Sequence, residues 1–194
     1  MVYYVEVAGS LNFLSVGRCV HPHDAVQQPF VSGVLLTPDD LMRFVLEANI
    51  PWIKLTTQHI EHVPAILDRV GDRATVFEGV DSLAYPSMAN GLVGWVSGPA
   101  NAIPELAIDL WRLTVVERDL GAAYALHRRL VPLLDYLWNQ GVFQSSLKEI
   151  WALRGYDQGA VRAPFRELEP AEREQVHAFA RALDLVPGAV GPAR

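Results

Sequence analysis

The stretch Pro51-Trp52-Ile53-Lys54-Leu55-Thr56-Thr57 decides how the chain is expected to fold, because it sets one lysine among apolar residues. Its length and composition predict a short buried strand, and side chains along a strand alternate between two faces. Lys54 then shares a face with Trp52 and Thr56, and its two apolar neighbours occupy the other face. In a sheet covered by helices the apolar face meets the helices, so Lys54 is expected on the inner side, near the carboxyl end of its strand.

Helix-like and strand-like segments alternate outward from this stretch, over residues 35–104. Apolar residues at helical spacing predict helices over 37–48, 63–70, 82–89 and 104–116. Short apolar runs predict strands over 50–55, 74–77 and 94–97. Nearly continuous apolar strands separated by helices favour parallel pairing, and hence an α/β fold.

The two ends of the chain follow other patterns. After residue 116, apolar residues three and four apart predict helices only, over 120–138, 145–153 and 170–185. Residues 187–194 are expected to form a flexible tail. Near the start, residues 12–19 fit a strand, and the segment 21–29, rich in Pro, His and Gln, is expected to be an irregular loop.

The composition argues against several classes of protein. Of the 194 residues, 51% are hydrophobic, and 16 Lys+Arg face 22 Asp+Glu, which gives a formal net charge of −6. An acidic chain without a basic run argues against a nucleic-acid or membrane surface. The single cysteine, Cys19, allows no internal disulfide, and the first residues lack the pattern of a signal peptide, so a reducing, cytoplasmic location is expected.

The chemistry expected of Lys54 follows from its surroundings. Only two lysines occur, and the other, Lys148, falls on a helix where a solvated or paired lysine is common. An amine at the end of a buried strand loses hydration, which lowers its pKa and frees the neutral form to attack a carbonyl group and form a Schiff base. The alternative is a lysine paired with a carboxylate at the rim of the sheet.

Further motifs follow Lys54 along the chain. Residues 78–81 read EGVD, and residues 91–105 read GLVGWVSGPANAIPE. With the lysine strand, they resemble the G-I-K-[ED]-[ST], S-G-x-D and G-x-x-G-x-[IV]-S-x-x-A-N-x-x-P-E motifs of the dihydrodipicolinate synthase / N-acetylneuraminate lyase family. The resemblance extends from about residue 29 to residue 185.

This resemblance implies a fold and an activity. Family members are TIM-type (β/α)8 barrels with a C-terminal helical extension. This chain resembles about the last four βα units, expected over residues 1–116 as a truncated barrel, followed by a C-terminal helical bundle over 117–186. The implied activity is that of a class I aldolase-type lyase or synthase acting on pyruvate or a related 2-keto acid. Lys54 would be the Schiff-base nucleophile, Gly79 and Val96 would line the substrate site, and no metal or organic cofactor is expected.

One family motif, Y-N-x-P-x-R-T-G, is not matched. Its best counterpart puts Val26 at the proton-shuttling tyrosine and Val31 at the carboxylate-binding arginine, and valine can do neither task. His21, His23 or Asp24 could replace the tyrosine, since imidazole titrates near neutrality. The family's glycine-threonine-threonine segment also lacks a counterpart. The alternative function is therefore a catalytically degenerate scaffold, or a regulatory partner of a full-length paralogue.

Two further expectations concern partners and metals. A half-barrel leaves strand edges and apolar inner faces uncovered, so we expect a homo-oligomer or a complex with a complementary half-barrel. A rival hypothesis is a metal-dependent hydrolase. Its basis is the spacing of His21 and His23, with which some barrel hydrolases hold a divalent ion, and His59 and His62 offer more nitrogen ligands.

Overall fold

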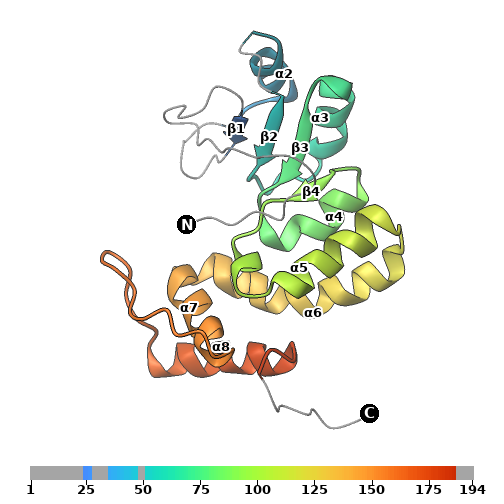
Figure 1. Ribbon diagram of the computed structural model, residues 1–194. Helices are drawn as coiled ribbons and strands as arrows, with labels where there is room; N and C mark the ends of the chain where they lie inside the picture. The colour runs from blue at the N-terminus through green and yellow to red at the C-terminus, as the bar shows by residue number, and fades with distance from the viewer. Residues whose placement is uncertain (1–23, 28–34, 48–50, 187–194) are drawn as a thin grey trace.

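A four-stranded parallel sheet forms the first part of the chain in the computed structural model, which describes residues 24–27, 35–47 and 51–186 (Figure 1). The strands lie in the order β1-β2-β3-β4, and every neighbouring pair is parallel. Their bounds are β1 Asp24–Gln27, β2 Trp52–Leu55, β3 Thr75–Glu78 and β4 Gly94–Trp95. The expected α/β fold with parallel strands is confirmed.

A helix follows each strand, as parallel pairing requires. The bounds are α2 Pro38–Glu47, α3 His62–Val70, α4 Ala84–Ala89 and α5 Pro104–Trp111. The start of α2 is the one that the sequence predicts. The Asp40 amide donates to Thr37 Oγ1 over 3.2 Å, and the Thr37 amide donates to Asp40 Oδ2 over 2.9 Å. This reciprocal pairing satisfies two backbone donors that a helix start would leave free.

A sheet core fills the space between the strands and the first two helices. Its members are apolar residues of β2, β3, α2 and α3 and of the segment before β4: Leu41, Val45, Ile53, Leu55, Val63, Ile66, Val70, Val76 and Leu92. Ile53 and Leu55 are each 1% exposed, while Trp52 and Lys54, which alternate with them along β2, are only half-buried. The sheet therefore has one face covered by α2 and α3, and Lys54 belongs to the other face.

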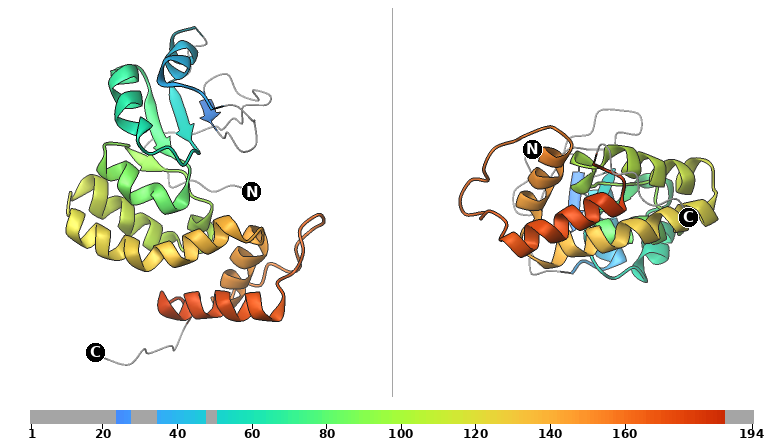
Figure 2. Two further views of the ribbon diagram at one scale, coloured as in Figure 1. Left: turned by 180° about the vertical axis from the view of Figure 1, so that it is seen from behind. Right: turned by 90° about the horizontal axis from the view of Figure 1, so that it is seen from below.

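Three longer helices form the second part of the chain. They are α6 Leu120–Asn139, α7 Phe143–Leu153 and α8 Pro170–Ala182. Figure 2 shows α8 beside α7 at the end of the molecule farthest from the sheet. A helical core, which includes Leu110, Leu130, Leu134 and Ile150, joins these helices to α4 and α5. The helices predicted after residue 116 are confirmed, with ends shifted by a few residues.

Two predictions made from the sequence need correction. The loop expected over 21–29 is wrong at Asp24–Gln27, because this segment pairs with all four residues of β2 and so gains the hydrogen bonds of a parallel ladder. The single helix expected over 104–116 ends as a regular α-helix at Trp111 and continues as a wider π-helical turn, in which the Glu117 amide donates to the Arg112 carbonyl. The predicted strand over 12–19 and tail over 187–194 lie outside the described residues.

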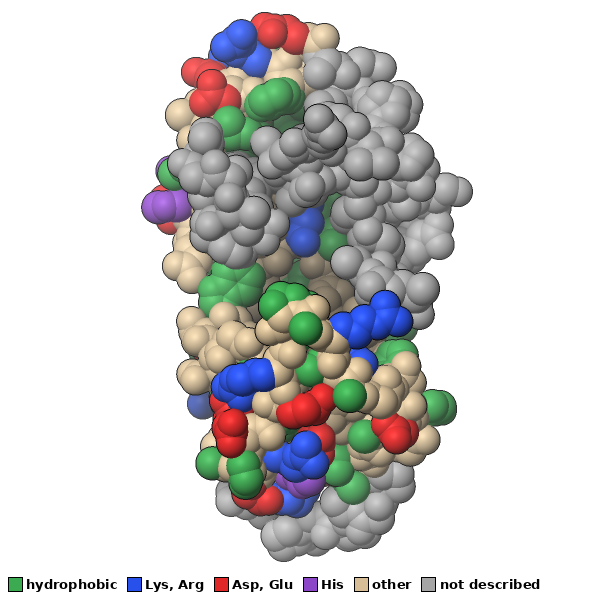
Figure 3. All heavy atoms as spheres, turned by 90° about the vertical axis from the view of Figure 1, so that its left-hand side faces the viewer, with side chains coloured by type: hydrophobic (Ala, Val, Ile, Leu, Met, Phe, Trp, Pro, Cys, Tyr) green, Lys and Arg blue, Asp and Glu red, His purple; other side chains and the backbone are tan. Residues whose placement is uncertain are grey.

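The described surface carries mixed charge. Figure 3 shows basic and acidic side chains interspersed over one face of the helical part, in line with the absence of a basic run from the sequence. Among the described residues, no helix is both long and apolar enough to cross a membrane.

Candidate active site

Lys54 lies where the alternation of β2 predicts it. It is paired in register with Phe77 of β3 on one side and with Val26 of β1 on the other. The position assigned to the family's tyrosine is thus directly beside the lysine, and a valine occupies it. No ion pair among the described residues includes Lys54, although Asp81 and Glu78 interact electrostatically with its amine. The paired-lysine alternative therefore stays a prediction.

Gly79 approaches the Lys54 side chain so closely that no other residue fits. A Cβ atom built on Gly79 would lie 2.5 Å from Lys54 Cε, 2.2 Å from Thr56 Oγ1 and 2.8 Å from the Leu55 carbonyl oxygen. The Gly79 amide donates to that same carbonyl over 2.6 Å, which extends the contact between the second and third strands past their ends. The glycine therefore forms one wall around the methylene chain of the lysine.

Glu78 holds this glycine in place from the helix side of the sheet. The side chain is 2% exposed, and Oε1 accepts hydrogen bonds from the amides of Gly79 and Val80, each over 2.7 Å. Oε2 accepts a hydrogen bond from Ser87 Oγ on α4. Burial raises the pKa of Glu78, and its hydrogen bonds and the charge of Lys54 oppose the rise. The carboxylate ties the turn after β3 to α4.

Asp81 is the second buried carboxyl group near Lys54. It is 7% exposed, and Oδ1 accepts a hydrogen bond from Trp95 Nε1 over 3.0 Å. Burial raises the pKa of Asp81 to about 7, although hydrogen bonds from Trp95 and Ser97 and the charge of Lys54 lower it. A carboxyl group with such a pKa exchanges protons readily near neutral pH.

Burial also changes the amine. It lowers the pKa of Lys54, because the ammonium form loses hydration, and the negative charges of Asp81 and Glu78 oppose this change. Lys148 differs in its surroundings, since its Nζ donates to the carbonyl oxygens of Gln158, Gly159 and Ala160 on an exposed loop. The two lysines of the chain therefore have different tasks, and Lys148 ties a loop to α7.

Val96 and Thr56 directly follow β4 and β2, respectively. Val96 is 5% exposed, and its amide donates to the Glu78 carbonyl over 2.8 Å. Thr56 is 2% exposed, and its Oγ1 has no hydrogen-bond partner within the described residues. Lys54, Gly79 and Val96, the three site residues implied by the resemblance, thus lie on three neighbouring strands or directly after them.

Sequence reasoning missed the roles of Glu78 and Asp81, which it treated only as motif letters. One signal was available for Glu78, because a charged residue that ends an apolar strand on its helix-facing side needs buried partners. No sequence signal pairs Asp81 with Trp95, fourteen residues later. Trp95 is 4% exposed in the helical core and also donates this bond.

The histidines proposed as metal ligands fall into two groups. His59 lies in the turn between β2 and α3, and His62 is the first residue of α3; their rings are stacked, 5.3 Å between centroids. His21 and His23 lie outside the described residues, as does Val31, and the side chains of Asp24 and Val26 are likewise not described.

The family model and the curated relatives that match this chain point to the same family. The sequence model of the Dihydrodipicolinate synthetase family matches residues 26–183. The chain is 33% identical over 160 residues to a 4-hydroxy-tetrahydrodipicolinate synthase of Thermomicrobium roseum, a match that covers 79% of this chain and 52% of the relative. It is 29% identical over 177 residues to the enzyme of the same name from Acidobacterium capsulatum, covering 90% and 58%. The chain thus spans little more than half the length of these relatives.

Solved structures of similar proteins agree. The dihydrodipicolinate synthase of Aquifex aeolicus superposes with a TM-score of 0.76 at 25% identity, over 84% of this chain and 56% of that one. The 4-hydroxy-tetrahydrodipicolinate synthase of Methylacidiphilum fumariolicum gives a TM-score of 0.76 at 25% identity, over 87% and 56%. The fold of these proteins is therefore shared over most of the chain.

Proposed function

The chain belongs to the dihydrodipicolinate synthetase family, and from this premise we propose that it is a lyase or synthase that forms a Schiff base with pyruvate or a related 2-keto acid. Lys54 is the nucleophile. The observation that carries the proposal is the position of its amine, half-buried at the carboxyl end of a strand, with its pKa lowered by burial. Both features increase the share of neutral amine, which is the reactive form.

The proposed reaction needs proton exchange at two points. The neutral amine adds to the carbonyl carbon of the keto acid, the nitrogen then releases one proton, and the carbonyl oxygen takes up one proton to give a neutral carbinolamine. A second proton on that oxygen allows water to leave, and the nitrogen lone pair forms the C=N bond of the imine. The imine then withdraws electrons from the neighbouring carbon, so no metal or organic cofactor is needed for this step.

Asp81 is the described group best suited to supply and accept these protons. Its pKa of about 7 lets it populate both protonation states near neutrality, and it interacts electrostatically with Lys54. Glu78 acts differently, as a positioning residue, because both of its oxygens already accept hydrogen bonds from the turn and from α4. We assign to it the task of keeping Gly79 against the lysine.

Gly79 and Val96 are proposed to line the substrate site through their backbone. The Gly79 amide donates to Leu55 and Glu78, and the Val96 amide donates to Glu78. With these amides engaged within the protein, the contact proposed at Gly79 is the close approach that a missing Cβ allows. Such a contact fits a small keto acid better than a bulky one.

The test is borohydride trapping with pyruvate, because hydride adds to the imine carbon and leaves a stable secondary amine. Intact mass and peptide mapping should locate one adduct, on Lys54. Lys54→Ala should abolish it, and Lys148→Ala is the matched control that removes the only other lysine and should leave it unchanged. Absence of an adduct in folded wild-type protein would contradict the proposal and favour the degenerate scaffold, which Val26 beside the lysine also favours.

Further strands from another polypeptide segment are part of the same proposal. Within the described residues, β1 and β4 form the two edges of the sheet, and the relatives are nearly twice as long as the matched part. We infer that a homo-oligomer or a complementary half-barrel covers the lysine face. Analytical ultracentrifugation of the same preparation used for trapping should find an assembly, and a monodisperse monomer that still forms the adduct would contradict this inference.

A further inference from the structure

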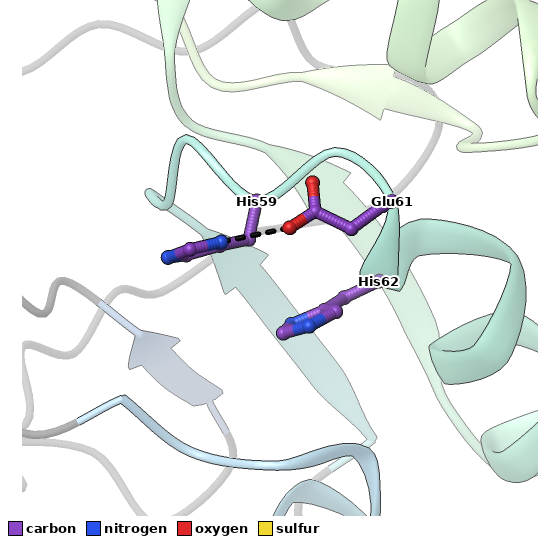
Figure 4. Close-up of side chains that lie close together, drawn as sticks. All are labelled: His59, Glu61 and His62. Atoms are coloured by element: carbon purple, nitrogen blue, oxygen red, sulfur yellow. Dashed lines mark hydrogen bonds and ion pairs between the residues drawn. The ribbon is translucent and has the colours of Figure 1, made fainter.

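Three side chains that commonly bind metals project from the turn after β2 and the first residue of α3. They are His59, Glu61 and His62, and Figure 4 shows them on one side of the turn, with the carboxylate of Glu61 above the two rings. His59 and Glu61 are half or more exposed, while His62 is partly covered. The group lies on the segment that directly follows the Lys54 strand, but it shares no residue with the site described above.

The distances between these side chains suit a single ion. One ligand atom from each residue lies within 4.8 Å of the others, and His59 Nδ1 lies 2.8 Å from Glu61 Oε1. The imidazole rings are nearly parallel, with an interplanar angle of 16°, so at least one ring must turn for both nitrogen lone pairs to point at the same ion. Ligand atoms around a tetrahedral zinc ion with bonds of about 2.0–2.1 Å lie roughly 3.4 Å apart. Side-chain rotations that move the ligand atoms by about 1 Å would therefore bring them to the spacing of a tetrahedral zinc site.

The backbone beneath the group is held in place, so that the ligands start close together. The His59 amide donates to Thr57 Oγ1 over 3.2 Å, and the His62 amide donates to the His59 carbonyl over 3.1 Å. Val63, which follows directly, is 2% exposed in the sheet core. A turn fixed in this way loses little conformational freedom when an ion binds, which favours binding.

We propose that His59, Glu61 and His62 form a binding site for a transition-metal cation of the zinc class. Two imidazole nitrogens with one carboxylate oxygen select Zn²⁺, Co²⁺ or Ni²⁺ over Mg²⁺ and Ca²⁺, which prefer oxygen ligands only. The ion takes the position between His59 Nδ1 and Glu61, where the two residues otherwise share a proton, so binding needs the neutral imidazole. Three protein ligands leave a fourth position for water.

The test is isothermal titration of the chelator-treated full chain with ZnCl₂, followed by the visible spectrum of the Co²⁺ complex. One equivalent should bind, and the Co²⁺ bands should have the intensity of a four-coordinate ion. His59→Ala and His62→Ala should each weaken binding by at least about tenfold, and the double variant should remove this equivalent. Circular dichroism checks that each variant is folded.

His177→Ala is the matched control. His177 also pairs with a glutamate, Glu149, over 2.6 Å. Among the described residues, however, His177 does not belong to a group of three or more side chains that could hold a metal ion. Its loss should leave zinc affinity unchanged. Zinc should also raise the melting temperature of the wild type and of His177→Ala, but not that of the double variant. No zinc binding by the wild type, or unchanged affinity in the double variant, would overturn the proposal.

Discussion

The strand ends around Lys54 and the helical part of the chain differ in the polar side chains that they bury. Near the lysine, two carboxyl groups are buried, Glu78 at 2% and Asp81 at 7% exposure. In the described helical part the buried polar side chains are the hydroxyls of Thr114, Ser145 and Ser146 and the imidazole of His127, with no carboxyl group among them. Lys148 reaches the carbonyl oxygens of an exposed loop. Burying a charge costs free energy unless partners compensate. The strand ends are therefore the region where the burial of carboxyl groups costs the most free energy of folding.

Replacing the carboxyl group of Asp81 is the test of this contrast for which we expect the largest change in folding stability. Because its pKa lies near 7 in the folded chain and near 3.8 when exposed, the folded state holds a proton that the unfolded state has released. The stability from this group is complete below about pH 4 and is lost as the pH rises to about 7. Three pKa units correspond to roughly 4 kcal/mol. Asp81→Asn keeps an acceptor for Trp95 and should remove this loss.

Urea unfolding of Asp81→Asn and the wild type at pH 4, 6 and 8 measures the difference. The stability of the variant relative to the wild type should grow across this range. Ion-paired carboxylates elsewhere change stability in the opposite direction at low pH, but they are common to both proteins and cancel in the difference. Parallel stability curves would show that Asp81 is ionised in the folded chain and is not a proton donor near pH 7.

Adding a methyl group at Gly79 is the next test. Gly79→Ala would place Cβ within 2.8 Å of the Leu55 carbonyl and closer still to Lys54 and Thr56, so the turn must move away from the lysine. Overpacking of this kind costs about 3 kcal/mol at the upper end of the usual range, and trapping of pyruvate should fall with it.

Gly121→Ala, near the start of α6, is the control for that substitution. Its Cβ would lie 3.5 Å from Asp119 Oδ1, an ordinary contact, so the helix should gain up to about 1 kcal/mol. Thermal unfolding and borohydride trapping measure both variants. Trapping that survives Gly79→Ala at the wild-type level would show that the lysine does not depend on the turn after β3.

The sequence predicts the elements of both regions but not how their polar groups are connected. Alternation in β2 correctly placed Lys54 opposite the apolar pair Ile53 and Leu55, since one buried face fixes the register of a strand. The segment Asp24–Gln27 was missed because its strand character comes from pairing with β2 and not from its own composition. Local propensity does not report such long-range pairing.

The candidate site likewise contains residues that the sequence could identify and contacts that it could not. Lys54 and Gly79 stand in motifs and could be named in advance. The bond from Ser87 to Glu78 depends on how α4 packs on the sheet, which no short pattern encodes. The neighbours His59 and His62 were each noted as ligands, but their stacking follows from the turn that the Thr57 hydroxyl holds. Residues that stand in motifs could thus be named from the sequence, whereas the contacts of their side chains could not.

Two buried serines, one in each region, provide the smallest test. Both side chains lie on helices at 0% exposure. Ser87 Oγ donates to the buried Glu78 carboxylate, whereas Ser146 Oγ has no partner within the described residues. Ser87→Ala leaves a buried carboxylate oxygen short of a donor and should cost about 1–3 kcal/mol, while Ser146→Ala removes an unpaired hydroxyl and should be neutral or slightly stabilising.

Comparing the two serines isolates the hydrogen bond, because the gain in helix propensity from serine to alanine applies to both helices. Denaturant midpoints at constant slope measure the two stabilities, and borohydride trapping adds a functional readout. If Glu78 positions Gly79 against Lys54, Ser87→Ala should also slow trapping, and Ser146→Ala should not. Equal losses of stability in the two variants, with trapping unchanged, would mean that Glu78 is held by the backbone amides of the turn alone and that α4 plays no part in positioning the lysine.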